Sequence, residues 1–295
     1  MSTGGYDLHT HSRCSDGLLR PGELVRRARL RVAGLAITDH DSVAGVEEAL
    51  AAGTATCMPV VPGVELTTDL GRHEVHILGY FIDHRHPALR SKLSRVCRGR
   101  LTRAKRIVAN LVEMGIPLPW MEVCRQAPGV FMGRPHIMRA LIAAGLVRRG
   151  AEDAFFQEYL ASGGRAFVPH EELGTEEAIL LTLMTGGVPV LAHPGRIGED
   201  AILPGLVALG LRGIEIHYPT HGPAEVERYL AFARAYGLVV TGGSDFHGHS
   251  GGPRLGDGVT SPTGVRTLAR YATGYAGWAF LSTLDMHIPG PSGKG

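Results

Sequence analysis

Short apolar runs that end in histidine, aspartate or glutamate recur along the chain. Continuous apolar runs are typical of strands that are buried on both faces of a sheet. We therefore predict a strand at each run, followed closely by a polar side chain. The seven runs cover residues 6–9, 35–40, 60–65, 74–80, 188–193, 213–217 and 238–245.

Helical patterns separate most of these runs, at residues 20–31, 175–184 and 223–236. Alternating strands and helices predict parallel β/α units. If the units close into a barrel, the carboxyl ends of all strands open at one mouth, where such barrels carry their chemistry. The polar residues that end the runs should then converge on one site.

One long stretch breaks this alternation. Residues 87–164 show helical patterns and no strand candidate, which predicts an inserted cap over the mouth. The alternative is that these helices belong to the outer layer of the barrel, but the length without a strand argues against it. The helical patterns cover residues 89–114, 120–126, 135–146 and 151–161.

The division predicts a discontinuous barrel domain of the α/β class. Residues 5–86 and 165–262 would form the barrel, and residues 87–164 the cap between them. Residues 263–295 would form a C-terminal extension that ends in Pro-Gly-Pro-Ser-Gly-Lys-Gly. The end of such a tail is expected to be disordered.

The composition narrows the class of protein. Hydrophobic residues make up 44% of the 295 residues, which is enough for a sizeable core. No apolar run approaches the ~18 residues that span a bilayer. Residues 1–7 also lack the features of a signal peptide, so we expect a cytoplasmic protein without membrane contacts. The four cysteines form no C-x-x-C pair, and the net charge is only +2, which argues against thiolate zinc and against polyanion binding by the whole surface.

Histidine is abundant, with 15 residues, and its positions indicate metal binding. His9 and His11 lie two apart in an extended segment and share a face, and Asp16 follows across a Ser/Gly loop. Nitrogen and oxygen donors without thiolate suit zinc, manganese or iron, and one ion takes about four to six of them. More than one ion is expected, because the chain offers six further candidates: His40, Glu65, His76, His193, Asp245 and His247.

Single members of this set also have a simpler interpretation. His76 lies inside an apolar run, where histidine is more often a hydrogen-bonded core residue, and Glu65 after Pro-Gly could cap a turn. The repetition of the pattern at seven strand ends favours the metal site for the set as a whole.

The motifs that carry these ligands resemble those of the PHP (polymerase and histidinol phosphatase) superfamily. The resemblance extends over about residues 6–262, and its first and last motifs are specific. It rests on Asp7-Leu-His-Thr-His-Ser12, Thr38-Asp-His-Asp41, Gly63-Val-Glu65, His76, Ala192-His-Pro194 and Gly243-Ser-Asp-Phe-His247.

The resemblance implies a distorted seven-stranded, TIM-like β/α barrel with a site for two to three divalent ions of manganese, iron or zinc. One ion would be held by His9, His11, Glu65 and Asp245. A second would be held by Asp16, His40 and His247, and the third by a bridging Glu65 with His76 and His193. The neighbouring Asp39, Asp41 and His73 would support these ligands or the local fold.

Clustered divalent ions favour the hydrolysis of phosphoric esters. They convert bound water to hydroxide near neutral pH and stabilise negative charge on the attacking and leaving oxygens. The nucleophile would be this metal-bound hydroxide, with no protein nucleophile. A metal hydrolase of C–N or carbonyl bonds uses one or two ions in a similar barrel and remains an alternative.

The cap offers a candidate phosphate site at Gly133-Arg-Pro-His136, which opens a predicted helix. Free N–H groups at a helix N-terminus bind anions, and Arg134 and His136 would add cationic donors. Arg165 and Arg196, which each follow glycine, are further candidates. Each arginine could instead be a solvated surface charge.

A second resemblance concerns the capped bacterial branch of the superfamily. Residues 133–136, 156–169 and 192–196 are similar to this branch, although it usually has lysine where Arg165 stands. The branch is typified by a nucleoside 3′,5′-bisphosphate phosphatase and by the 5′-to-3′ exoribonuclease RNase AM. The implied substrate is a nucleoside bisphosphate or a short, single-stranded, 5′-phosphorylated RNA, and no stable protein partner is inferred.

Two alternative functions remain open. A histidinol-phosphate-type phosphatase would use the same barrel, although the cap suits a second phosphate. A noncatalytic nucleic-acid-binding subunit would have no need of a complete ligand set. It would use residues 90–106, where eight of seventeen residues are lysine or arginine. We predict that these charges line the exposed face of an amphipathic helix, either as a solvated face or as a track for an RNA backbone.

Overall fold

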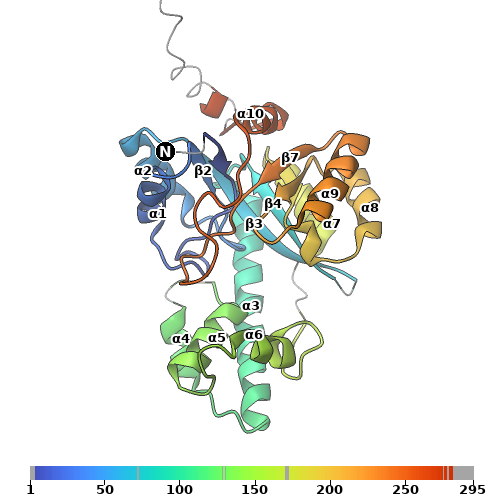
Figure 1. The fold of residues 1–295 in the computed structure, drawn as a ribbon. Coiled ribbons are helices and arrows are strands. Elements are labelled where there is room, and N and C mark those ends of the chain that lie inside the picture. The colour runs from blue at the N-terminus through green and yellow to red at the C-terminus, as the bar shows by residue number, and fades with distance from the viewer. Residues whose placement is uncertain are drawn as a thin grey trace, which may run out of the picture.

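The computed structural model describes residues 4–71, 73–127, 129, 131–169, 173–274, 276–277 and 279–281. A seven-stranded sheet, in which the strands pair in chain order, forms its centre (Figure 1). The sheet nearly closes, because Thr10 after the first strand forms a parallel bridge with Phe246 after the last. The predicted seven-stranded α/β barrel is confirmed. The strands are β1 (Tyr6–Asp7), β2 (Gly34–Ile37), β3 (Val60–Leu70), β4 (His73–Tyr80), β5 (Val188–Leu191), β6 (Gly213–His217) and β7 (Val239–Gly242).

Strand β4 runs antiparallel to both of its neighbours, whereas the other pairs are parallel. The expectation of parallel strands throughout is therefore wrong at β4. Strands β3 and β4 form a hairpin that turns at Gly71, whose φ of +62° suits glycine. Because of this reversal, His76 in the first half of β4 lies at the edge where the parallel strands end.

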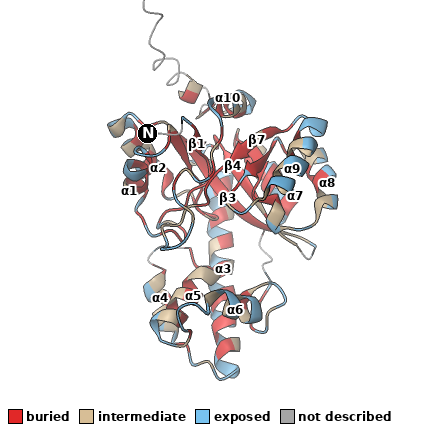
Figure 2. Ribbon diagram, in the orientation of Figure 1, coloured by how far each residue is buried: buried red, intermediate tan, exposed pale blue. Residues whose placement is uncertain are grey.

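Helices cover the outside of the barrel. The helices α1 (Pro21–Ala28) and α2 (Val46–Thr56) pack beside β2, and α7 (Thr175–Met184), α8 (Leu203–Ala208) and α9 (Pro223–Tyr236) pack beside β3 to β6. Their inward faces are buried and their outer faces are exposed (Figure 2). In the described part of the chain, none of the helices combines the length and the apolar character that a membrane span requires.

The barrel interior is filled by apolar side chains from the strands. Leu8, Val61 and Val190 belong to this cluster, together with Val265 and Leu268 of α10 (Pro262–Tyr271). Helix α10 covers the end of the barrel opposite the cap (Figure 1). The first part of the predicted extension 263–295 thus packs on the barrel core, and the end expected to be disordered lies outside the described residues.

The cap has its own apolar core. It is built from α3 (Pro87–Glu113), α4 (Trp120–Gln126), α5 (Arg134–Ala143), α6 (Glu152–Phe155) and a π-helical turn (Phe156–Leu160).

Helix α3 contributes to both cores over its 27 residues. Leu89 and Val96 pack in the barrel core, whereas Ile107 and Leu111 pack in the cap core. The helix therefore joins the two parts, and the cap boundaries at residues 87 and 164 stay predictions.

Two basic residues of α3 are buried, so the prediction that all of them line an exposed face is wrong. Arg100 and Arg103 are only 5% and 6% exposed. They share the helix face of Val96 and Ile107, which lies against the barrel and the cap core. Polar partners compensate this burial, because Asp41 accepts from Arg100 and the carbonyl of Val168 accepts from Arg103.

Gly243, after β7, lies against the backbone of the chain that follows β1. A Cβ at this position would stand 2.2 Å from the Cβ of His9 and 2.5 Å from its backbone nitrogen. We expect Gly243→Ala to lower the free energy of unfolding by about 1–3 kcal/mol, because the backbone has to shift. Urea unfolding in chelator measures this without a contribution from metal.

Gly205 in α8 provides the matched control, because a Cβ added there meets no atom within 4 Å. Gly205→Ala should leave the stability unchanged or raise it, since alanine favours a helix. Equal stability of the two variants would contradict the close approach at Gly243.

Candidate active site

The predicted ligands converge at the mouth of the barrel, beneath the cap. His9 and His11 are fully buried at the base of the site. The other seven line a cavity of about 200 Å³ that also borders the cap: Asp16, His40, Glu65, His76, His193, Asp245 and His247.

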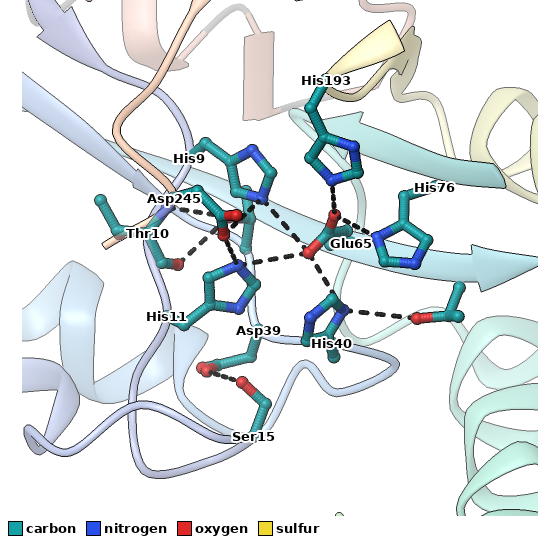
Figure 3. A network of polar contacts seen from close by, with 12 residues as sticks. His9, Thr10, His11, Ser15, Asp39, His40, Glu65, His76, His193 and Asp245 are labelled. Atoms are coloured by element: carbon teal, nitrogen blue, oxygen red, sulfur yellow. Dashed lines mark hydrogen bonds and ion pairs between the residues drawn. The ribbon is translucent and has the colours of Figure 1, made fainter. Parts of the chain in front are cut away.

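The carboxylate of Glu65 lies at the centre of the cluster, with imidazoles around it (Figure 3). Its Oε2 atom is 3.2 Å from Nε2 of both His9 and His11 and 3.0 Å from Nδ1 of His40. Its Oε1 atom is 2.8 Å from Nδ1 of His76 and 3.2 Å from Nε2 of His193. One carboxylate thus connects five imidazoles from four segments of the barrel.

Three groups in the described part of the chain have ligand atoms that all lie within 4.8 Å of one another. The first has the same four members as the set implied by the resemblance, and the second adds His11 to an implied set. The third group differs from the third implied set, because it contains His40 in place of His193. His193 nevertheless contacts Glu65. The groups are His9, His11, Glu65 and Asp245; His11, Asp16, His40 and His247; and His40, Glu65 and His76.

Several ligand atoms are buried without a hydrogen-bond partner among the described residues. They include Nε2 of His9, both ring nitrogens of His11, Oδ1 of Asp16 and Oε2 of Glu65. Unpaired buried polar atoms are costly. These atoms face one another as nitrogen and oxygen donors without thiolate, so the residues present fit divalent transition-metal ions.

The carboxylates of the cluster are held in the ionised form. Burial acts to raise the pKa of Asp16, but His247 and His40 bring it well below its ordinary value. In the same way, His9 and His247 outweigh burial and hold the pKa of Asp245 well below its usual range. Ionised carboxylates are the form that binds metal.

Two further carboxylates hold the loops that carry these ligands. Asp7 accepts hydrogen bonds from the backbone and hydroxyl of Ser244, which precedes Asp245. Asp39 accepts from the backbone and hydroxyl of Ser12 and from the hydroxyl of Ser15, which precedes Asp16. The supporting role expected for Asp39 agrees with these contacts.

The backbone is strained at two of the ligands. His193 and Asp245 have φ values of +28° and +54°, in the left-handed region that non-glycine residues rarely adopt. Such conformations persist where the surroundings enforce them and are concentrated at functional sites.

Glu215 is a site residue for which we predicted no role. Its Oε1 atom is 3.0 Å from Nδ1 of His9, and Oε2 accepts from the backbone nitrogen of His193 at 2.9 Å. This contact orients His9 so that Nε2 faces Glu65. The sequence signal that could have identified Glu215 is a charged residue inside an apolar run. The expectation that His217 ends this run in the site is wrong, because the register shifts after Glu215 and His217 is exposed.

The cap side of the cavity is basic. Arg103 donates from Nε to the carbonyl of Val168, while its buried Nη2 has no hydrogen-bond partner among the described residues. Burial lowers the pKa of Arg103 to about 10, with Arg134 and Arg100 acting in the same direction, so it is protonated at neutral pH. The sequence analysis predicted Arg134 as a contact on this side of the cavity but gave no such role to Arg103.

A chain of contacts joins the cap to the ligand cluster. Arg134 donates to both carboxylate oxygens of Glu74 at 2.7 Å, and Glu74 lies 3.3 Å from Nε2 of His76. Burial acts to raise the pKa of Glu74, but His76 and Arg134 hold it well below its usual range. Glu74, which contacts the candidate ligand His76, therefore fixes the position of Arg134 in the cavity lining.

The four predicted substrate contacts divide into two pairs. Arg134 and Arg196 line the cavity, whereas His136 and Arg165 are not among its lining residues. Arg165 is exposed and donates to Glu158 and to the hydroxyl of Tyr159.

His136 is buried, and its surroundings disfavour the cationic donor predicted at this position. Burial lowers its pKa to about 4, with Arg139 acting in the same direction. Its Nδ1 accepts from the backbone nitrogen of Gly133 at 3.2 Å, and Pro135 has no N–H. The backbone part of the predicted phosphate cradle is thus reduced to Arg134.

Comparison with known proteins places the chain in a family. The PHP domain model matches residues 7–114. A 3′,5′-nucleoside bisphosphate phosphatase from Chromobacterium violaceum is 37% identical over 255 residues, which cover 84% of this chain and 89% of the relative. The chain belongs to the PHP family.

Further comparisons agree with this assignment. The 5′-3′ exoribonuclease Rnm from Salmonella typhimurium is 36% identical over 277 residues, covering 88% of this chain and 91% of the relative. A Bifidobacterium adolescentis protein described as a metal-dependent phosphoesterase superposes with a TM-score of 0.85 at 33% identity, covering 92% of this chain and 98% of that one. The PHP protein is a hydrolase that acts on phosphoric ester bonds, as predicted.

We expect the purified PHP protein to contain more than one equivalent of transition metal per chain, because its ligands exceed one coordination sphere. Glu65→Ala should lose most of this metal, since Glu65 contributes to two of the three ligand groups. Elemental analysis after desalting measures both values. Glu176→Ala removes an exposed carboxylate and should retain the wild-type content. At most one equivalent in the wild type, or equal content in the two variants, would contradict the site.

Proposed function

We propose that this PHP protein hydrolyses the 3′-phosphate of nucleoside 3′,5′-bisphosphates and removes 5′-nucleotides one at a time from short, 5′-phosphorylated, single-stranded RNA. The observation that carries the proposal is a cavity with two unlike walls. The barrel wall carries imidazoles and carboxylates, and the cap wall carries Arg103 and Arg134. A substrate with two phosphates would place one at each wall.

Two to three divalent ions of manganese, iron or zinc are part of this proposal. His9, His11, Glu65 and Asp245 would hold one, Asp16, His40 and His247 a second, and Glu65 with His76 and His193 the third. When bound, such ions activate water and stabilise charge on the attacking and leaving oxygens. The unpaired buried donor atoms and the absence of thiolate from the ligand groups support this assignment.

Arg103 and Arg134 would bind the phosphate that is not cleaved. Arg103 is the stronger candidate, because its buried Nη2 lacks a protein partner among the described residues. A buried guanidinium hydrogen without an acceptor is satisfied well by a phosphate oxygen. Arg134 already donates to Glu74, so it would position the phosphate with its remaining donors.

Arg196 would contact the phosphate that is cleaved. Its Nη1 lies 3.6 Å from Oδ2 of Asp245 and 3.3 Å from the hydroxyl of Tyr218, at the rim of the ligand cluster. Its side chain is 60% exposed, which leaves donors free for a substrate. Nothing in the position of Arg165 supports a substrate contact.

The size of the cavity favours phosphate and sugar over a whole nucleotide. Its volume of about 200 Å³ is below the roughly 300–1,000 Å³ of sites for drug-sized ligands. The base would therefore lie outside, so hydrolysis would be largely independent of the base, and a duplex would not enter. A histidinol-phosphate-type substrate would leave the basic wall without a partner, which disfavours that alternative. The cytoplasmic location stays a prediction from the sequence.

Arg103→Met tests the basic wall while retaining side-chain volume. We expect kcat/KM for adenosine 3′,5′-bisphosphate to fall about 30- to 1,000-fold, the equivalent of about 2–4 kcal/mol for a desolvated charge-assisted contact. Turnover of adenosine 3′-monophosphate, which lacks the second phosphate, should change little. Arg165→Met, at an exposed position, should resemble the wild type. An equal loss on mono- and bisphosphates would reject the role of Arg103.

The direction of RNA cleavage tests the function itself. A 5′-phosphate on the basic wall would place the next phosphorus at the ligand cluster, and misplacement by about 1 Å costs on the order of a hundredfold in rate. Oligoribonucleotides with 5′-phosphate should therefore be shortened from that end, with 5′-hydroxyl RNA about a hundredfold slower, as followed by gel electrophoresis of 3′-labelled RNA. Equal rates, or mononucleotides released from the 3′ end, would be incompatible with the proposal.

A further inference from the structure

A second, larger hollow lies beside the active site, between α3 and the loop after β2. Its volume is about 660 Å³. We call it the α3 groove. Its lining includes two arginines and four apolar residues: Arg90, Arg98, Val43, Leu93, Leu101 and Met132.

The α3 groove begins where the active-site cavity ends. Asp41 lines the groove, and the preceding residue, His40, lines the cavity. In the same way, Met132 lines the groove and the preceding residue, Phe131, lines the cavity. Arg100 separates them, because it donates to Asp41 and lies over the ring of Phe131 at 4.5 Å. A chain that leaves the cavity past Phe131 would enter the groove.

The free charge in the groove is positive. Its two carboxylates are neutralised by basic neighbours, since Asp41 pairs with Arg100, and Glu47 pairs with Arg85 and His84. Arg90 and Arg98 have no carboxylate partner within the described part of the chain, and Arg98 donates only to the hydroxyl of Ser94. The two arginines stand eight residues apart on α3, which is about 12 Å along a helix.

Apolar residues line the same groove as these charges. Leu101 is 38% exposed and Val43 is half-buried. Leu93 and Met132 complete this apolar floor. Proteins hold single-stranded nucleic acid in a basic groove that follows the phosphates, with side chains that contact the bases. In this groove the lining offers aliphatic rather than aromatic contacts for the bases.

We propose that the α3 groove holds the part of an RNA substrate that lies 3′ of the scissile phosphate. Arg90 and Arg98 bind its phosphates, and Leu101 and Met132 contact its bases. The proposal rests on the proposed function, because it requires a strand that continues beyond the nucleotide in the cavity. A nucleoside bisphosphate does not reach the groove.

The double variant Arg90→Gln/Arg98→Gln removes both charges. A matched control is Arg95→Gln/Arg106→Gln, which removes two exposed charges of the same helix outside the groove. Steady-state kinetics would be compared on adenosine 3′,5′-bisphosphate, a 5′-phosphorylated dinucleotide and a 5′-phosphorylated octanucleotide at several salt concentrations.

We expect wild-type protein to have a lower KM for the octanucleotide than for the dinucleotide. The groove variant should raise KM for the octanucleotide about tenfold and leave turnover of the bisphosphate unchanged, which also shows that it folds. The slope of log kcat/KM against log salt should become shallower by about 1.4, at about 0.7 for each phosphate contact on a single strand. The control variant should behave as wild type.

Leu101→Glu adds a negative charge to the groove at a partly exposed position and should raise the same KM. Equal losses in the groove and control variants would overturn the proposal that the groove binds RNA. A wild-type KM that does not depend on the length of the RNA would overturn it as well. Turnover of the bisphosphate without cleavage of RNA would also overturn it. Wild-type protein that is inactive on both substrates would instead refute the proposed function.

Discussion

The burial of the Glu65 carboxylate is the constraint on which the site depends. The residue is 0% exposed, and an ionised carboxylate buried alone would cost several kcal/mol. The imidazoles around it offset this cost, and their electrostatic effect holds the pKa of Glu65 well below its usual range against the effect of burial. Those imidazoles come from the segment after β1, the loop after β2, β4 and the loop after β5. The site therefore exists only when the barrel has nearly closed.

The cap is tied to this cluster by charge as well as by packing. Arg100 of α3 pairs with Asp41, next to His40, and Arg134 of α5 pairs with Glu74, which contacts His76. Removing one partner of the buried Arg100–Asp41 pair would leave an uncompensated charge, at a cost of about 3–5 kcal/mol. The cap position and the orientation of two histidines are thus coupled. The long helix α3 strengthens the coupling, because it packs in both cores.

The two unlike walls suggest how binding energy serves the reaction. Contacts with a phosphate that is not cleaved hold the substrate in the orientation in which the other phosphate reacts. The guanidinium groups of the cap wall suit such contacts, because they stay charged at neutral pH and present fixed donor geometry. A short cavity followed by a groove would let the same site accept a small nucleotide or the end of a strand.

The sequence by itself determined the seven strands, the helical cap and the convergence of the nine candidate ligand residues at the mouth. These features depend on local order, such as the spacing of His9 and His11 or an apolar run that ends in a charged residue. It did not determine the direction of β4, because an apolar run is the same for parallel and antiparallel pairing. Nor did it identify Glu215, Arg100 or Arg103 as residues of the site, since their partners lie far away along the chain. The lowered pKa of His136 was also decided mainly by the tertiary structure, because burial in the folded cap is its largest cause, ahead of the effect of Arg139 three residues along the chain.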